Sequence, residues 1–254
     1  MEPYIKELKP YEKDLDYTYI TGILNINNVY KVNPDAVMCI LVVDSCNIKK
    51  LLYVQSMKCK GISAIVITQQ RAAALNIDGD IAAVIRKKDM TQIRDDTRHL
   101  ILDNINQESN MGGIIRTAVA SGITDIAYIG NKIQDFDSVK INNYSVGLRH
   151  SVNIEVFDNI SSYLERFPGR RIYSFILSED SIMIDEIKSL PPIYSMAFGN
   201  ELLGLGEEYK AKGVNVKIPL CNNVDSFNVN TSIGIGLYAF NKLSKLWYTN
   251  KRKT

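Results

Sequence analysis

The stretch "ESNMGGIIRTAVASG", residues 108–122, decides the fold class of this chain. It closely follows an apolar run, "HLILDNI" at residues 99–105, which predicts a buried strand. Small and polar residues then lead into apolar positions at helical spacing, so the stretch predicts a loop that enters a helix. Arg116 lies in the first turns of that helix, among apolar neighbours. Its stem could simply cover apolar surface, or its guanidinium could serve a site at the end of the strand.

The alternation of strand and helix continues toward the C-terminus. Six apolar runs predict strands: "LILDNI", "DIAYIG", "VNIEVF", "IYSFIL", "YSMAFG" and "VNVKIPL". Helices are predicted over "GGIIRTAVAS", "ISSYLERF", "EEYKAK" and, as a long last helix, "NVNTSIGIGLYAFNKLSKLWYTN". Strands and helices in alternation predict an α/β fold with a mostly parallel sheet that is covered on both faces.

A charged segment divides the chain. "RKKDMTQIRDDTRH", residues 86–99, is poor in large apolar residues and predicts a linker. Before it, strands are predicted at "VMCILVVD", "AIVIT" and "IAAVIRK", with a helix over "KKLLYVQSMKCKG" that ends at Gly61. We therefore expect a small α/β domain over residues 1–95 and a second domain over residues 96–254.

The composition is that of an ordinary globular protein, with 46% hydrophobic and 23% charged residues among 254. The net charge of +2 does not indicate a polycation, so any contact with nucleic acid must rest on local patches. The four cysteines form no CxxC pair and only two histidines are present, which disfavours a metal site and favours free thiols. The N-terminus is charged and no apolar run approaches the length of a membrane helix, so we expect a cytoplasmic protein.

Three loops at predicted strand ends are rich in Asn, Gly and small polar residues: "NINQESNMGG", "GNELLGLG" and "PLCNNVDSFNVN". Ligands of parallel α/β sheets bind at the carboxyl ends of the strands, so these loops form the candidate site. No GxGxxG opens a helix after a strand and no GxxxxGK[ST] is present, which disfavours a dinucleotide site and a P-loop. The two histidines do not assemble into a Ser-His-Asp or Cys-His nucleophile set.

The three loops together carry a family resemblance. Their motifs, in chain order, are Asn110-x-Gly112-x-x-x-Arg116-Thr117-Ala118, Gly199-x-Glu201-x-x-Gly204-Leu205, and Ile218-Pro219-Leu220 followed by Ser226-Phe227-Asn228-Val229. This triple resembles the SpoU (TrmH-like) branch of the SPOUT RNA methyltransferases, from about His99 to the C-terminus. The resemblance implies a deep trefoil knot, bent S-adenosylmethionine in the knot loops, a homodimer, and methylation of a ribose 2′-hydroxyl in RNA. The N-terminal half loosely resembles the L30e-type substrate-binding domain that often precedes this fold.

The resemblance also implies roles for individual residues. Cofactor binding falls to Gly199, Glu201, Gly204, Ile218, Leu220, Phe227 and Asn228, and catalysis to Arg116, Asn110 and Glu201. Simpler roles stay open, because the glycines could end a strand, the apolar residues could belong to the core, and Asn228 could cap the last helix. Glu201 could favour a helix start through the dipole. Asn110 would orient Arg116 or the ribose, or it could be an ordinary loop residue.

Two mechanisms are open for Arg116. As a general base it would have to lose a proton, although an unperturbed arginine holds its proton far above neutral pH. Binding the substrate phosphate with its planar fork and stabilising the developing alkoxide is physically easier, and we favour this role. The methyl-transfer chemistry belongs to the sulfonium of the cofactor.

The chain departs from the family pattern at two points. Where the family usually shows a proline before the first Asn, this chain has Gln107-Glu108-Ser109. The family motif Ser-Leu-Asn-Val-Ser ends here in Asn230, which keeps a polar group but not the hydroxyl. We expect these changes to bear on the substrate rather than on the reaction.

The leading prediction is a ribose methyltransferase acting on structured RNA, first of all 23S rRNA, because the L30e-like half favours rRNA. A tRNA substrate is the nearest alternative, and a non-catalytic knotted RNA-binding dimer or a ligand-binding regulatory protein are the other classes. The clusters "NIKK", "KCKG" and "IRKK" could contact phosphates or could be solvated helix ends. The dimer interface is predicted from apolar residues of the last helix: Ile233, Ile235, Leu237, Tyr238, Phe240, Leu243 and Trp247.

Overall fold

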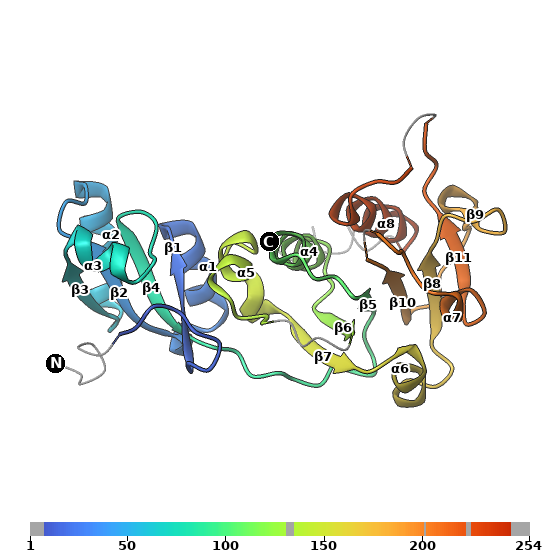
Figure 1. Cartoon of the computed structure of the whole chain (residues 1–254), viewed down its shortest axis with the longest axis horizontal. Coiled ribbons are helices and arrows are strands. Elements are labelled where there is room, and N and C mark those ends of the chain that lie inside the picture. Colours follow the sequence, from blue (N-terminus) through green and yellow to red (C-terminus); the bar gives the residue numbers. More distant parts are fainter. Residues whose placement is uncertain (1–7, 131–134, 201, 222–224, 245–254) are drawn as a thin grey trace. The chain divides into compact units, whose positions relative to one another are not determined.

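The structure is a computed structural model that describes residues 8–130, 135–200, 202–221 and 225–244. The chain forms two compact units (Figure 1). The first contains Met1–Asp89 together with Asp135–Ser151, and the second contains Met90–Gln134 together with Val152–Thr254. The chain therefore passes between the units three times, once at each of these boundaries.

The second unit is built on a seven-stranded sheet in the order β7-β6-β5-β10-β8-β11-β9. Its strands are β5 (His99–Asp103), β6 (Asp125–Ile129), β7 (Asn153–Phe157), β8 (Arg171–Phe175), β9 (Ile182–Met183), β10 (Tyr194–Phe198) and β11 (Val214–Lys217). All pairings between them are parallel. Every residue of β5, β6 and β10 is buried, as expected for a parallel sheet covered on both faces. The predicted α/β class and all six predicted strands are confirmed, while β9 is too short to leave a pattern in the sequence.

The helices of the second unit include the long pair that flanks the candidate site. They are α4 (Glu108–Ala120), α6 (Ile160–Arg166), α7 (Glu207–Lys210) and α8 (Val229–Leu243), with a 3₁₀ turn η4 (Ile184–Glu186). α8 packs against α4 (Figure 1). Its residues Ile233, Leu237 and Phe240 are buried, and the Phe240 ring lies 5.0 Å from the ring of Tyr173. One face of α8 is therefore anchored in the core.

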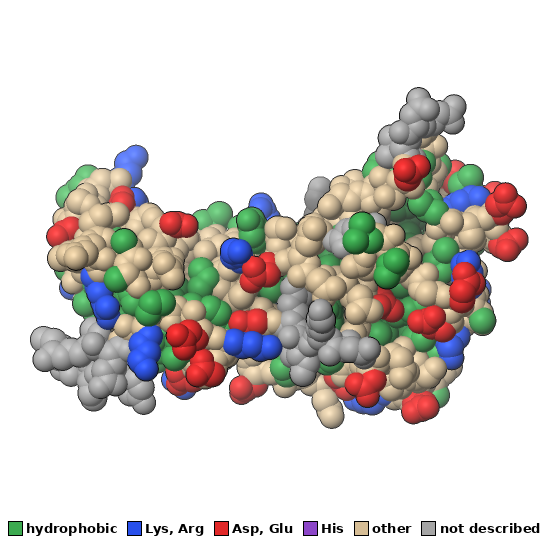
Figure 2. All heavy atoms as spheres, viewed as in Figure 1, with side chains coloured by type: hydrophobic (Ala, Val, Ile, Leu, Met, Phe, Trp, Pro, Cys, Tyr) green, Lys and Arg blue, Asp and Glu red, His purple; other side chains and the backbone are tan. Residues whose placement is uncertain are grey.

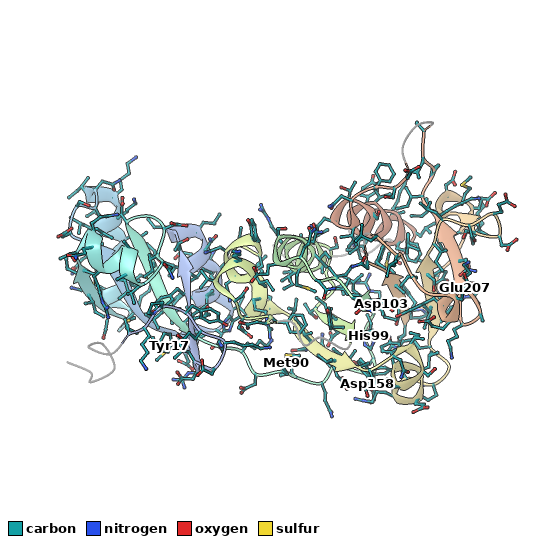
Figure 3. All side chains as sticks on the ribbon, in the orientation of Figure 1. Tyr17, Met90, His99, Asp103, Asp158 and Glu207 are labelled. Atoms are coloured by element: carbon teal, nitrogen blue, oxygen red, sulfur yellow. The ribbon has the colours of Figure 1, made fainter. Side chains whose placement is uncertain are left out.

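A chain of buried polar groups lies at the amino ends of β5 and β10. The oxygen of Tyr163 is 2.7 Å from Nδ1 of His99 and 2.7 Å from Oγ of Ser195. The other ring nitrogen of His99, Nε2, donates to the carbonyl oxygen of Arg94 at 2.7 Å, so Nδ1 accepts from the tyrosine hydroxyl. Burial, together with the nearby Arg170, lowers the pKa of His99 to about 4. The ring is therefore neutral at pH 7. Figure 3 labels His99 at the start of β5 and Asp103 at its end.

The first unit contains a four-stranded mixed sheet in the order β1-β4-β2-β3. Its strands are β1 (Tyr17–Thr21), β2 (Val37–Val43), β3 (Ser63–Ile67) and β4 (Ile81–Arg86), and its helices include α1 (Ile23–Val32), α2 (Ile48–Cys59) and α3 (Gln69–Ala74), with a 3₁₀ turn η2 (Pro34–Ala36). β2 and β3 are parallel, and β4 is antiparallel to both of its neighbours. The three predicted strands and the helix before Gly61 are confirmed. β1 escaped prediction because its threonines and tyrosines interrupt the apolar pattern.

Residues 135–151 follow β6 in the chain but pack in the first unit. They form α5 (Val139–Tyr144), which packs on β1, and a 3₁₀ helix η3 (Leu148–Ser151), which packs on α1. Oδ1 of Asn143 accepts a hydrogen bond from the backbone N–H of Thr21 at 3.0 Å. Nδ2 of Asn28 donates to the carbonyl oxygen of Val146 at 2.8 Å. The predicted domain boundary puts this segment in the second domain. Hydrogen bonds of asparagine side chains leave no periodic pattern in the sequence, so these contacts with the first unit could not be predicted.

Candidate functional site

The second unit has a cavity of about 520 Å³ at the carboxyl ends of β8, β10 and β11. Its lining includes Phe175, Ile176 and Leu177 after β8, Phe198, Gly199, Asn200, Leu203 and Gly204 after β10, Ile218, Leu220 and Phe227 after β11, and Val229 and Ser232 of α8. This is the edge of a parallel sheet at which α/β proteins bind their ligands. The volume is also that of a small-molecule site.

The loop after β10 closes tightly on itself. The backbone N–H of Gly204 donates to the carbonyl oxygen of Asn200 at 2.8 Å, and Gly204 has a φ of +66°, a conformation that favours glycine. A Cβ on Gly199 would lie 2.2 Å from the carbonyl carbon and oxygen of Gly204. Any side chain at Gly199 would therefore push the loop apart. The two glycines shape a loop that lines the cavity.

Apolar residues also line the cavity. The rings of Phe175 and Phe198 stack with their centroids 4.2 Å apart and their planes at 17°. Ile218 is buried, whereas Phe227 keeps 39% of its surface exposed. Aromatic rings in the lining of one cavity offer flat apolar surface, which suits a planar heterocycle.

Charged side chains line the cavity where it meets α7. Nζ of Lys210 lies 2.6 Å from Oε1 of Glu207, and Nζ of Lys217 donates to the carbonyl oxygen of Ser178 at 3.4 Å. Glu207 is labelled in Figure 3, and acidic side chains gather over β9 and α7 on the face drawn in Figure 2. This side of the cavity offers both signs of charge to a ligand.

A cluster of amide side chains joins the start of α4 to the start of α8. Asn110 is buried, and its Oδ1 accepts from Nδ2 of Asn228 at 3.4 Å and from Nδ2 of Asn230 at 3.3 Å. Nδ2 of Asn110 donates to Oε1 of Gln107 at 3.1 Å. Oδ1 of Asn228 caps α8 by accepting from the backbone N–H of Asn230 at 2.9 Å. The capping role that the sequence left open for Asn228 is therefore confirmed.

Arg116 lies on α4 with its side chain exposed. It does not line the cavity, and no hydrogen bond or ion pair joins it to another residue that the structure describes. Arg94 shows the contrast, because its Nη2 is held 2.6 Å from a carboxylate oxygen of Asp125. The guanidinium of Arg116 is therefore available to a ligand that approaches α4 from solvent.

The structure brings most of the predicted site residues together. Gly199, Gly204, Ile218, Leu220 and Phe227 line one cavity, and Asn110 and Asn228 are bonded to each other beside it. Glu201 lies outside the described residues. The lining after β8 was missed, because the motifs give no strand order and only the observed order places β8 between β10 and β11.

The described residues contain no group of three His, Cys, Asp or Glu side chains that could hold a metal ion. The four cysteines are free thiols. No helix in the described ranges combines the length and the apolar character that crossing a membrane requires.

The SpoU rRNA methylase family matches residues 97–238 of this chain. The match spans more than half of the chain, and it includes all three loops of the candidate site. The chain belongs to the SpoU rRNA methylase family. The matched SpoU region begins just before β5 and ends within α8, so outside residues 135–151 it lies in the second unit.

Two curated SpoU relatives act on different RNAs. The chain is 24% identical over 141 residues to the 23S rRNA (adenosine(1067)-2′-O)-methyltransferase of Streptomyces azureus, covering 55% of this chain and 52% of that enzyme. It is 29% identical over 157 residues to the tRNA (guanosine(18)-2′-O)-methyltransferase of Aquifex aeolicus, covering 60% of this chain and 72% of that enzyme. The chain thus matches about half the length of the first relative.

A solved SpoU structure has the same fold over nearly the whole chain. The SpoU methyltransferase AviRb from Streptomyces viridochromogenes, solved in complex with AdoMet, superposes with a TM-score of 0.71. The superposition covers 90% of this chain and 91% of that chain at 16% sequence identity. At this identity the likeness shows the fold alone, and it confirms the predicted SPOUT fold class.

Proposed function

We propose that this chain is an S-adenosylmethionine-dependent methyltransferase that modifies a ribose 2′-hydroxyl of RNA. One arrangement carries the proposal. A ligand-sized cavity at the ends of three parallel strands is joined, through the amide cluster of Asn110, Asn228 and Asn230, to the helix that bears Arg116. Membership of the SpoU family and the activities of both relatives support it.

The residues of the cavity fit this cofactor. The adenosine would be held by the Gly199–Gly204 loop and by the apolar Ile218, Leu220 and Phe227. Asn228, beside the cavity, is proposed to contact the cofactor as well, and Glu201 to complete the loop. The paired charges of Glu207 and Lys210 suit the ammonium and carboxylate of an amino-acid moiety. When bound, the cofactor supplies an electrophilic methyl group on its sulfonium.

Arg116 would bind the RNA backbone and stabilise charge on the 2′-oxygen. A guanidinium presents parallel donors to a phosphate, and it stays protonated at pH 7. The 2′-hydroxyl would lose its proton to solvent water, and the fixed positive charge of the guanidinium would stabilise the alkoxide that develops on the 2′-oxygen. Asn110, held by its neighbours, would orient the ribose or Arg116.

The substrate is proposed to be structured RNA, with 23S rRNA as the leading candidate and tRNA as the alternative. The first unit would supply RNA affinity, and the exposed face of α8 would form a homodimer. We also propose the trefoil knot for the second unit and action in the cytoplasm.

The test is methyl transfer from radiolabelled S-adenosylmethionine to purified 23S rRNA and, in parallel, to a tRNA pool. Ribose methylation is then mapped by resistance to alkaline cleavage. We expect label at a 2′-oxygen in one of the two RNAs, with rRNA preferred. Cofactor binding without transfer to either RNA would leave a non-catalytic binder and overturn the proposal.

A further inference from the structure

We infer that Asn230 is a positioning residue for the methyl-transfer reaction, and that Gly113 is the residue that makes room for it. The inference rests on the proposed function and concerns the point at which this chain departs from the family motif. It assigns the pair to the contact between α4 and α8, beside the cavity.

The first observation is steric. Gly113 lies on the face of α4 that contacts α8, and a Cβ built on it would lie 2.7 Å from Nδ2 and 3.0 Å from Oδ1 of Asn230. Real Cβ atoms do not approach an amide nitrogen this closely, so the side chain of Asn230 occupies the space that an alanine methyl would need. The two positions are matched in size.

The second observation is polar. Nδ2 of Asn230 donates to Oδ1 of Asn110 at 3.3 Å, so it helps to hold the buried Asn110 in place. Oδ1 of Asn230 is buried and has no hydrogen-bond partner within the part of the chain that the structure describes. A buried acceptor without a donor is destabilising. Its presence points to a donor that arrives only in the working complex.

The third observation identifies that donor. Arg116 lies three residues after Gly113 on α4, and residues at this spacing are neighbours on a helix surface. Long helical side chains lean toward the N-terminus of their helix, which directs Arg116 toward the turn that carries Gly113. The guanidinium is exposed and can rotate without breaking a bond to another described residue. We assign Asn230 Oδ1 as the acceptor that steadies Arg116 when RNA is bound.

The test compares wild type with Gly113→Ala, Asn230→Ser and Arg116→Ala, and with the two double variants that combine Asn230→Ser with each of the others. Gly234→Ala is the matched control, because it adds the same methyl group on the facing helix. A Cβ at this position would only touch Cγ2 of Thr117, at 3.9 Å. Single-turnover methyl transfer is measured at saturating RNA and cofactor, alongside cofactor affinity by calorimetry and the melting temperature.

We expect Gly113→Ala and Asn230→Ser each to slow transfer at least tenfold, with cofactor affinity within twofold of wild type. In the Asn230→Ser background, adding Gly113→Ala should have no further effect, because the smaller side chain leaves room for the methyl. Asn230→Ser should likewise slow an Arg116→Ala enzyme less than twofold. Gly234→Ala should keep the wild-type rate.

The inference would be overturned if the rate losses of the two single variants multiplied in either double variant. It would also be overturned if the slow variants were those with a lowered melting temperature. An inactive wild-type protein would instead refute the proposed function. The two failures are therefore distinguishable in one experiment.

Discussion

Three arginines of the chain differ in the partners that the structure gives them. Arg149 is fully buried and paired with Asp137 at 3.2 Å, and Arg94 binds Asp125 with several hydrogen bonds. Although burial raises the pKa of Asp125, the bonds from Arg94 outweigh it and hold that pKa at about 2. These arginines stabilise the fold, whereas Arg116 is exposed on α4. Its guanidinium has no hydrogen bond or ion pair to any residue in the described ranges, and α4 also carries part of the buried amide cluster, so this is the cation that we expect to meet the substrate.

Replacing Arg116 with alanine should lower the single-turnover rate of methyl transfer by more than about 10²-fold, the usual cost of losing one preorganised donor. Arg116→Lys should restore little, because an ammonium does not present two parallel donors. Cofactor affinity should stay within twofold, since Arg116 does not line the cavity. Arg171→Ala, at the opposite end of the sheet, is the control. A rate above about a tenth of wild type for the alanine variant would contradict a catalytic role.

Stability should fall as the pH is lowered from about 6.5 to about 4. Burial lowers the pKa of His99 and of His150 to about 4, from 6.5 in the unfolded chain. Between pH 4 and pH 6.5 the unfolded chain binds more protons than the folded protein, so the free energy of unfolding rises with pH in this range. It is unaffected by these histidines above about pH 6.5 and falls as the pH is lowered toward 4. At pH 5 the loss is about 2 kcal/mol for each histidine.

Urea unfolding at pH 7.5 and pH 5 measures this difference. His99→Asn should be less stable at both pH values but should show a smaller difference between them. Asp125, whose pKa is about 2, stays ionised at both pH values, so it does not contribute to the difference in stability between pH 7.5 and pH 5. An equal pH difference in variant and wild type would show that His99 does not titrate as described.

Whole elements of the second unit were accessible to prediction because their causes are local. The apolar runs of β5, β6 and β10 and the helical spacing of α8 follow from burial on one or both faces. The strand order is not local, and it alone brings the residues after β8 to the cavity. The sequence alone does not show why position 199 requires glycine. The reason is again a non-local contact, because the loop folds back and the backbone of Gly204 lies where a Cβ of Gly199 would be.

Placement of the α5 segment could not be predicted from periodicity. Its contacts with the first unit include hydrogen bonds that Asn143 accepts from Thr21 and that Asn28 donates to the segment. Gly147 also packs closely, because its Cβ would lie 2.4 Å from the carbonyl oxygen of Asn25. Such contacts need the partner's position as well as the sequence. Glu201, in the second motif, lies outside the described residues, so its role stays a prediction.

The outer face of α8 should carry the dimer contact. Ile233, Leu237 and Phe240 are buried in the core, whereas Tyr238 is 56% exposed. Trp247, also predicted for this interface, lies outside the described residues. We expect light scattering to give twice the chain mass of 28.6 kDa, and Tyr238→Asp to shift the protein toward the monomer.

An aspartate placed in an apolar interface is desolvated without a partner, which disfavours association. Tyr144→Asp on α5 is the matched control, because Tyr144 is 52% exposed. A wild-type protein that is monomeric at micromolar concentration would refute the dimer. A dimer unaffected by Tyr238→Asp would move the interface away from this face.

The chain as a whole joins its two units through three connections rather than one. Deleting residues 1–89 alone would therefore strip the partner surface from residues 135–151. Ile141 and Phe136 in that segment are buried, and we expect the simple truncation to aggregate because it exposes them. A clean separation of the units must remove both parts of the first unit.

A chain that lacks residues 1–89 and carries a Gly/Ser linker in place of 135–151 should fold and bind S-adenosylmethionine. β6 and β7 are parallel neighbours of five residues each, so the linker must return along about 17 Å of strand, and about ten residues suffice. The cavity residues all belong to the second unit, so cofactor affinity should match the full chain within about threefold by calorimetry. Methylation of RNA should fall at least tenfold in kcat/KM, because the basic clusters of the first unit are gone. A truncated protein that methylates RNA at the full rate would show that the second unit recognises its substrate without the first.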